Sequence, residues 1–72
     1  MVRVFNIDGG KVRELRERAG MDQPTLAARV GIKQPTLSQI ETGKRNTKPE
    51  ITLKIAEALG VTFDDITERI AS

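Results

Sequence analysis

Apolar residues recur along most of the chain at intervals of three and four, the spacing of helices that each bury one side. Glycines divide this pattern into short runs, so the connections between the runs must be short. The pattern predicts helices over residues 11–19, 22–30 and 34–42, and a fourth helix that begins at 47–50. Their inward stripes are Val12, Leu15 and Ala19; Leu26, Ala27 and Val30; Leu37 and Ile40; and Ile51, Ile55, Ala58 and Leu59.

Capping residues mark several of the helix ends. Asp8 or Gly10 is placed to cap the first helix, and Asp22 stands at the N-cap position of the second. Residues 47–50, with the sequence TKPE, match the capping box that opens many helices. Gly43 is expected to follow the third helix in the left-handed conformation.

The two ends of the chain are expected to differ in structure. Residues 2–5 alternate at the period of a strand but are too short to form a sheet alone, so residues 1–8 are interpreted as an arm on the core or on a partner, or as a loosely ordered terminus. Residues 62–72 are expected to form a fifth helix, capped by Thr62. The predicted fold class is all-α: one compact five-helix domain over residues 1–72.

The composition excludes several classes of function. A chain of 72 residues is near the lower size limit for folding without staples, and it has no cysteine and no histidine. Disulfides, thiolate nucleophiles and the usual zinc sites are therefore excluded, and we expect no catalytic residue, no metal and no cofactor. No apolar run is long enough to span a bilayer, and the N-terminus lacks a signal peptide's apolar core, so a cytoplasmic location is expected.

Charge is unevenly distributed along the chain. Residues 31–48 carry four Lys/Arg against one Glu, a net +3, whereas residues 49–72 carry two Lys/Arg against five Asp/Glu, a net −3. A cluster of cations suits a polyanionic partner such as nucleic acid. On charge alone, chance unevenness in a small chain is an equal alternative.

The outward side of residues 34–42 is neutral and rich in hydrogen-bonding groups. On a helical wheel it holds Gln34, Pro35, Ser38, Gln39 and Thr42. A glutamine can bind adenine through N6 and N7, serine and threonine can bond to several bases, and proline can pack against a thymine methyl group. These side chains suit base edges in the major groove, although by themselves they are also typical of a plain polar helix face.

The helices on either side of Gly31 predict a helix-turn-helix. Ala27 and Gly31 are small residues that let the following helix cross closely, and Gly31 can adopt the positive φ of a tight turn. Ile32 then returns the chain to the core. Two short helices joined by three or four residues with a glycine form this motif.

At this point the sequence resembles a known family, the Xre type of helix-turn-helix proteins, which includes phage repressors and Cro proteins. The resemblance is carried by 20-GMDQPTLAARVGIKQPTLSQIETGKRN-46 and 53-LKIAEALGV-61, and it covers about residues 7–67. It implies a five-helix domain that binds operator DNA, usually as a dimer, and regulates transcription.

The resemblance also implies a role for each residue of the motif. Residues 34–42 become the recognition helix, with Gln34, Pro35, Ser38 and Gln39 facing the bases. The contacts to the DNA backbone fall on Gln23, Lys33, Thr36, Lys44, Arg45 and Asn46. Arg16 and Glu41 match positions that pair in the family, and we interpret them as a half-buried structural ion pair.

Three residues depart from the family pattern. Lys33 stands where Ser or Thr usually caps the recognition helix, so we expect the cap to be lost and a phosphate contact to replace it. Pro35 removes one hydrogen-bonding reader. Thr52 stands where a core leucine is common, so the fourth helix packs less fully or Leu53 compensates.

The main hypothesis is a sequence-specific DNA-binding regulator, a repressor that binds a palindromic operator as a homodimer. The dimer contact is assigned to Phe63, Ile66 and Ile70, with the N-terminal arm as a further candidate; the alternative is that these residues only close the monomer core. The second hypothesis is a protein-interaction module, such as an antitoxin-like partner with secondary DNA binding. Two phenylalanines without tyrosine or tryptophan disfavour a stacking platform for single strands.

Overall fold

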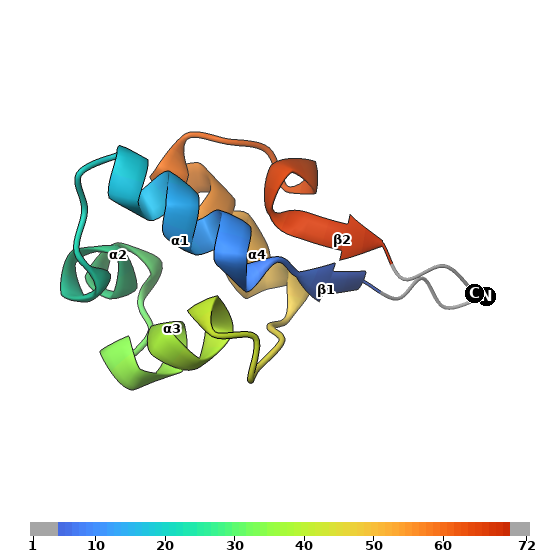
Figure 1. Ribbon diagram of the computed structural model, residues 1–72, viewed down its shortest axis with the longest axis horizontal. Helices are drawn as coiled ribbons and strands as arrows, with labels where there is room; N and C mark the ends of the chain where they lie inside the picture. The colour runs from blue at the N-terminus through green and yellow to red at the C-terminus, as the bar shows by residue number, and fades with distance from the viewer. Residues whose placement is uncertain (1–4, 70–72) are drawn as a thin grey trace.

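Four helices and one short strand pair make up residues 5–69, the part of the chain that the computed structural model describes (Figure 1). None of the helices within these residues is long and apolar enough to cross a membrane. The elements in chain order are β1 (Phe5–Ile7), α1 (Gly9–Arg18), α2 (Gln23–Val30), α3 (Gln34–Glu41), α4 (Pro49–Leu59), the 3-10 turn η1 (Asp64–Ile66) and β2 (Thr67–Arg69).

The fifth helix predicted over residues 62–72 is wrong for its described part. Thr62 and Asp65 cap each other, but the helical turn ends at Ile66 and Thr67 is extended, with φ −127° and ψ 151°. The carbonyl of Ile66, which a longer helix would use internally, accepts a hydrogen bond from the backbone N–H of Asp8 at 2.8 Å. Pairing with the N-terminal strand therefore replaces the helix; residues 70–72 lie outside the described part.

The two ends of the described chain form an antiparallel strand pair. Phe5 is opposite Arg69, Asn6 opposite Glu68 and Ile7 opposite Thr67. The rings of Phe5 and Phe63 lie with their centroids 5.0 Å apart, which covers one side of the pair with apolar area. The N-terminal arm thus packs on its own chain from Phe5 onwards, while residues 1–4 lie outside the described part.

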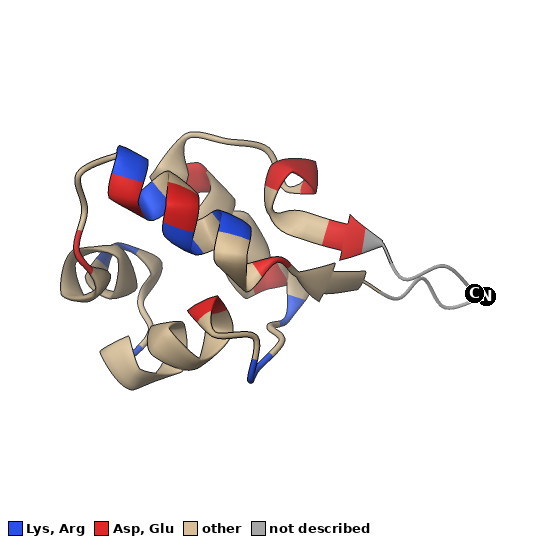
Figure 2. Cartoon of the chain, viewed as in Figure 1, with Lys and Arg blue, Asp and Glu red and all other residues tan. Residues whose placement is uncertain are grey.

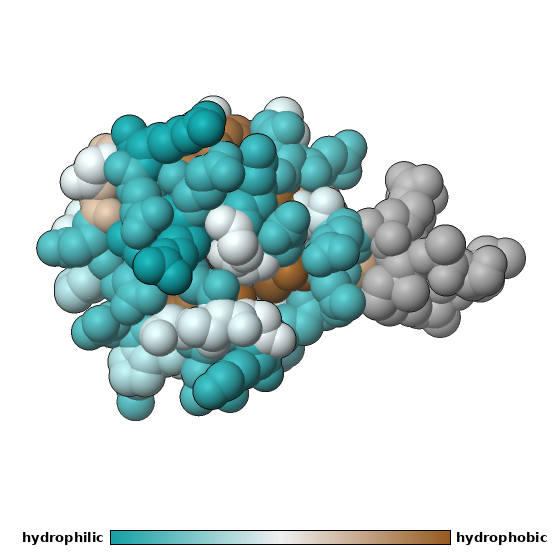
Figure 3. Space-filling model, in the orientation of Figure 1, coloured by the Kyte–Doolittle hydropathy of each residue, from teal (hydrophilic) through white to brown (hydrophobic). Residues whose placement is uncertain are grey.

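The predicted apolar stripes meet in one core. The fully buried large side chains there are Val12, Leu26, Leu37, Ile40, Ile55 and Ile66. Leu15 and Leu59 pack at its edge, whereas Ala19, predicted as part of the first stripe, is exposed. The face shown in Figure 3 is mostly hydrophilic, with apolar residues visible in small areas between the elements.

The start of α4 differs from the prediction. Lys48, not Thr47, is the N-cap residue, and it makes no side-chain capping bond. The Thr47 hydroxyl instead hydrogen-bonds the hydroxyl of Thr52, which also donates to the carbonyl of Lys48 at 3.1 Å. Thr52 is fully buried with its hydroxyl satisfied, and Leu53 does not compensate, since it is 50% exposed.

Gly9 brings α1 against the end of α3 at a distance that only glycine permits. A Cβ atom at this position would lie 1.9 Å from the carbonyl oxygen of Ile40 and 3.0 Å from the carbonyl carbon of Glu41. Both are backbone atoms of the packed helix α3, so they cannot move away from the new atom as a flexible side chain could. The contact fixes the distance between the first helix and the helix that carries the predicted base-facing residues.

We expect Gly9→Ala to lower the free energy of unfolding by about 3 kcal/mol or more, because the new methyl group collides with backbone. Gly10→Ala is the matched control. A Cβ there meets only the Asp8 carboxylate at 3.6 Å. Alanine should therefore leave the free energy of unfolding unchanged or raise it by up to about 1 kcal/mol. Urea denaturation of both variants measures the difference, and equal stability would contradict the close contact.

Candidate nucleic-acid interface

A three-residue turn sets α3 across α2. Gly31 ends α2 with φ +86° and ψ 28°, the left-handed conformation predicted for it. The backbone N–H groups of Gly31 and Ile32 both donate to the carbonyl of Ala27, at 2.8 and 3.0 Å. Ile32 then packs against the core, and α3 begins after Lys33.

The outer face of α3 carries the residues predicted to meet bases. Gln34, Pro35 and Gln39 are exposed, and Ser38 is half-buried. The opposite face is anchored by Leu37 and Ile40, which are fully buried. The helix therefore exposes neutral polar side chains on one side, while its other side is packed into the core.

The N-terminus of α3 has no side-chain cap. Lys33 occupies the N-cap position and makes no capping hydrogen bond, as its mismatch with the family pattern predicts. Pro35 lies in the first turn, where its missing N–H costs little. The positive end of the helix dipole and the exposed Lys33 side chain are therefore next to one another.

An ion pair inside the fold ties α1 to the last residue of α3. Arg16 Nε donates to Glu41 Oε2 at 2.7 Å and Arg16 Nη2 donates to Glu41 Oε1 at 3.0 Å, with the two side chains 10% and 1% exposed. Arg16 Nη1 also donates to the carbonyl of Met21 at 2.8 Å. The hydrogen bonds that Arg16 donates to Glu41, opposed by burial, raise the pKa of Arg16 above its ordinary value, so the guanidinium stays charged.

Two glutamines extend this pair to the molecular surface. Gln23 Nε2 donates to Glu41 Oε1 at 3.0 Å, and Gln34 Nε2 donates to Gln23 Oε1 at 3.2 Å. The side chain of Gln34, at the exposed start of α3, is thus oriented by a chain of bonds that begins in the core. The resemblance implies a contact of Gln23 with the DNA backbone, and the amide of Gln23 lies beside the base-facing side of α3.

The α3–α4 loop, residues 42–48, carries the cations of this region. Lys44 and Arg45 are exposed. The loop leaves α3 through Gly43, and the N–H of Lys44 donates back to the carbonyl of Gln39 at 2.9 Å. Arg45 and Thr36 line one hollow of about 470 Å³ between α3 and α4, so these two predicted backbone-contacting residues lie near each other.

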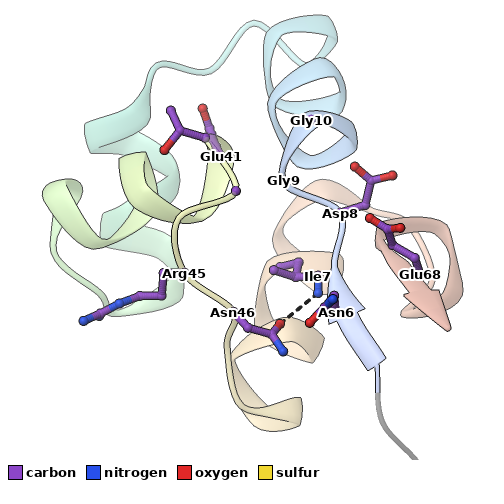
Figure 4. A pocket seen from close by; sticks show the side chains of 11 residues that line it. Asn6, Ile7, Asp8, Gly9, Gly10, Glu41, Arg45, Asn46 and Glu68 are labelled. Atoms are coloured by element: carbon purple, nitrogen blue, oxygen red, sulfur yellow. Dashed lines mark hydrogen bonds between the residues drawn. The ribbon is translucent and has the colours of Figure 1, made fainter. Parts of the chain in front are cut away.

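Asn46 was assigned to the DNA backbone, but its side chain is engaged within the chain. Asn46 Oδ1 accepts from the N–H of Ile7 at 2.9 Å (Figure 4). Asn46 Nδ2 donates to the carbonyl of Phe5 at 3.0 Å. The resemblance gave no sign of this bridge. The sequence carries no local signal for this bridge, because Asn46 and Ile7 are 39 positions apart in the chain.

The α3 side of the molecule and the strand pair differ in the sign of their charge. Figure 2 shows α3 without charge before its last residue and the following loop with cations, whereas η1 and β2 carry acidic residues. Asp64, Asp65 and Glu68 are exposed on the latter elements. A polyanion is therefore attracted to the loop and repelled from the strand pair.

We expect Glu41→Ala to lower the free energy of unfolding by about 3–5 kcal/mol, because it leaves the Arg16 guanidinium buried without its partner. Glu17→Ala is the matched control: Glu17 pairs with Arg13 at 3.4 Å, but both side chains are more than half exposed, so the loss should stay below about 1 kcal/mol. Thermal and urea unfolding of the two variants measure the contrast. Similar losses for both would show that the buried pair does not hold the fold.

Several solved structures share this fold. The restriction-modification controller protein C.AhdI from Aeromonas hydrophila is 35% identical, with a TM-score of 0.76 over 79% of this chain and 86% of that chain. The DNA-binding domain of the P22 c2 repressor in solution is 26% identical, with a TM-score of 0.77 over 81% of this chain and 76% of that chain. The P22 c2 repressor in complex with synthetic operator 9T matches with the same identity and TM-score, over 81% and 88%.

Among curated proteins, no sequence matches the chain significantly. The family model HTH_3, described as helix-turn-helix, matches residues 12–66, which include α2, the turn and α3. This match agrees with the geometry of the turn at Gly31 and with the structural neighbours. The chain therefore belongs to the HTH_3 helix-turn-helix family and is a DNA-binding transcriptional regulator of the Xre type, not an enzyme.

Proposed function

We propose that the protein is a repressor that places α3 in the major groove of a palindromic operator and binds it as a homodimer. The observation that carries this proposal is the outer face of α3: neutral, hydrogen-bonding, fixed by buried Leu37 and Ile40, and followed at once by a cationic loop. The P22 c2 repressor, which shares the fold, has been crystallised with an operator, and this supports the proposal.

The residues proposed to read bases are Gln34, Pro35, Ser38 and Gln39. Gln34 comes with its amide oriented by Gln23, so less side-chain freedom is lost when it meets a base edge. Its carbonyl oxygen and its second amide hydrogen can then face an adenine. Gln39 is exposed one turn further along, where a second base pair would be reached.

The residues proposed to contact phosphates surround this face. Lys33 adds its charge to the uncapped positive end of α3, which suits an anion. Lys44 and Arg45 follow the other end of α3. Thr36 lies on the helix between Lys33 and this loop, and Gln23 lies on the adjoining helix α2. Such contacts fix the position of the protein on the duplex and supply salt-dependent affinity, not sequence choice.

A homodimer would place two copies of α3 about 34 Å apart on one side of the duplex and so select a palindrome. The dimer contact assigned to Ile66 is wrong, because this side chain is fully buried in the monomer core. Phe63 is half-buried against Phe5, and Ile70 lies outside the described residues. We keep the dimer as a proposal without an assigned interface, and we expect the protein to act in the cytoplasm beside its DNA.

The decisive experiment is selection of binding sites from random duplex DNA with the purified protein. The proposal predicts a pair of inverted half-sites whose centres lie one helical turn apart, about 10 base pairs. A single unrepeated site would contradict the dimer but not the reading by α3. No enrichment of any sequence would overturn sequence-specific binding altogether.

We expect Gln34→Ala and Gln39→Ala to reduce discrimination at separate base pairs, each by about 1–3 kcal/mol of binding free energy. Titration against operators that carry each single base change locates the position that each residue reads. Thr25→Ala, an exposed polar residue on α2, is the control and should leave the preference intact. If both glutamine variants keep the full preference, α3 is not the reader.

We expect Lys44→Ala and Arg45→Ala to weaken all duplexes alike, because phosphates carry no sequence. Each should reduce the slope of log Kd against log salt by about 0.9, the value for one phosphate contact. Lys54→Ala removes the same charge from α4, outside the loop, and should change the slope less. A loss of affinity confined to one base pair would contradict the assignment to the DNA backbone.

A further inference from the structure

We infer that the strand pair positions Arg45 for DNA through Asn46, so that affinity for DNA depends on two strands that do not touch it. This inference rests on the proposed phosphate contact of Arg45. Asn46 is here a positioning residue, in place of the direct phosphate contact that the family resemblance implies. Four observations carry the inference, from the loop outwards to β2.

The first observation is that Arg45 and Asn46, neighbours in the chain, point in opposite directions (Figure 4). Asn46 reaches across to β1, and Arg45 extends away from it. Because two consecutive side chains share one backbone segment, fixing one orients the other. A backbone that holds Asn46 toward β1 presents Arg45 to the opposite side.

The second observation is the form of the contact between Asn46 and β1. The amide of Asn46 accepts from the N–H of Ile7 and donates to the carbonyl of Phe5, the two groups on either side of Asn6. A residue of a parallel neighbouring strand would bond to these same two groups with its backbone. Asn46 therefore acts as a one-residue third strand, and its geometry is set by two bonds rather than one.

The third observation is that the loop is anchored on both sides of Arg45. On the α3 side, the N–H of Gly43 donates to the carbonyl of Ile40 at 3.1 Å, and the N–H of Lys44 donates to Gln39 at 2.9 Å. On the α4 side, the next anchor is Asn46. Without the Asn46 bridge, the nearest anchor on the α4 side would be Thr47, whose hydroxyl bonds Thr52. Arg45 would then be held less closely, and ordering it on DNA would cost more conformational entropy.

The fourth observation is that β1 is itself held by β2. The Asp8–Ile66 backbone bond and the strand register put Asn6 and Glu68 in the next hydrogen-bonded pair of the ladder. The backbone bonds of this pair lie at the edge of β1 opposite Asn46, because the N–H and C=O groups of successive residues in a strand point to alternate edges. A change at Glu68 can therefore loosen β1 without touching Asn46 or the loop.

The test uses salt dependence, which separates positioning from direct contact. Asn46→Ala replaces a neutral residue by a neutral residue, so the loss of a direct Asn46–phosphate bond would lower affinity and leave the salt slope unchanged. If Asn46 positions Arg45, the variant should lose about tenfold in affinity and also flatten the slope, approaching the change of about 0.9 expected for Arg45→Ala. The double variant Arg45→Ala/Asn46→Ala should then be little worse than Arg45→Ala alone.

Glu68→Pro extends the test to the far strand, because proline removes the backbone N–H that the ladder uses. Glu68→Ala is the matched control, since it removes the same carboxylate and keeps the N–H. We expect Glu68→Pro to bind several-fold more weakly than Glu68→Ala, with a flatter salt slope. Equal affinity and slope for these two variants would overturn the role of β2, and an unchanged slope in Asn46→Ala would overturn the role of Asn46.

A readout without DNA separates this inference from the proposed function. In the free protein, Glu68→Pro should shift the NMR signals of the Arg45 and Asn46 amides and speed hydrogen exchange at Ile7, relative to Glu68→Ala. If the wild-type protein binds no duplex, the proposed function fails while these shifts still report the coupling. If Glu68→Pro does not fold, the salt slope of Asn46→Ala decides the question.

Discussion

The carboxylate of Glu41 is a charge kept inside the fold, and the geometry of the DNA-facing side depends on how it is satisfied. Two bonds from Arg16 and one from Gln23 surround it. Since each donor comes from a different helix, the pair fixes α1, α2 and α3 in one register. A pair of this kind contributes less to net stability than to the choice of a single arrangement, because desolvation offsets much of its attraction.

The helices could be predicted from the sequence because their signals are local. Asp22, as predicted, and Asp8, one of the two caps predicted for the first helix, accept from backbone N–H groups three residues ahead. The turn at Gly31 follows from glycine's freedom of φ. The strand pair could not be predicted in the same way. Strands of three residues carry almost no periodicity, and their stability depends on partners at opposite ends of the sequence. The capping box at residues 47–50 matched its pattern and still failed, because Thr52 offers the Thr47 hydroxyl a buried partner.

The candidate site shows the same division between residue type and residue partner. The neutral face of α3 and the cations of the loop are visible in the sequence because exposure there follows from helical spacing. The bridge from Asn46 to β1 and the close approach at Gly9 are contacts between distant segments. Sequence composition identifies what such residues can bond to, and only the fold decides which of those bonds they make.

The antiparallel pairing of Phe5 with Arg69 also has a mechanical meaning. A force that separates the two ends of the described chain acts perpendicular to the strands. In this unzipping geometry the backbone hydrogen bonds of the strand pair are loaded and broken one after another. Such geometry yields at low force. Tension applied through any segment joined to both ends would open the strand pair, and with it the side of the loop held by Asn46, well before it reached the helices.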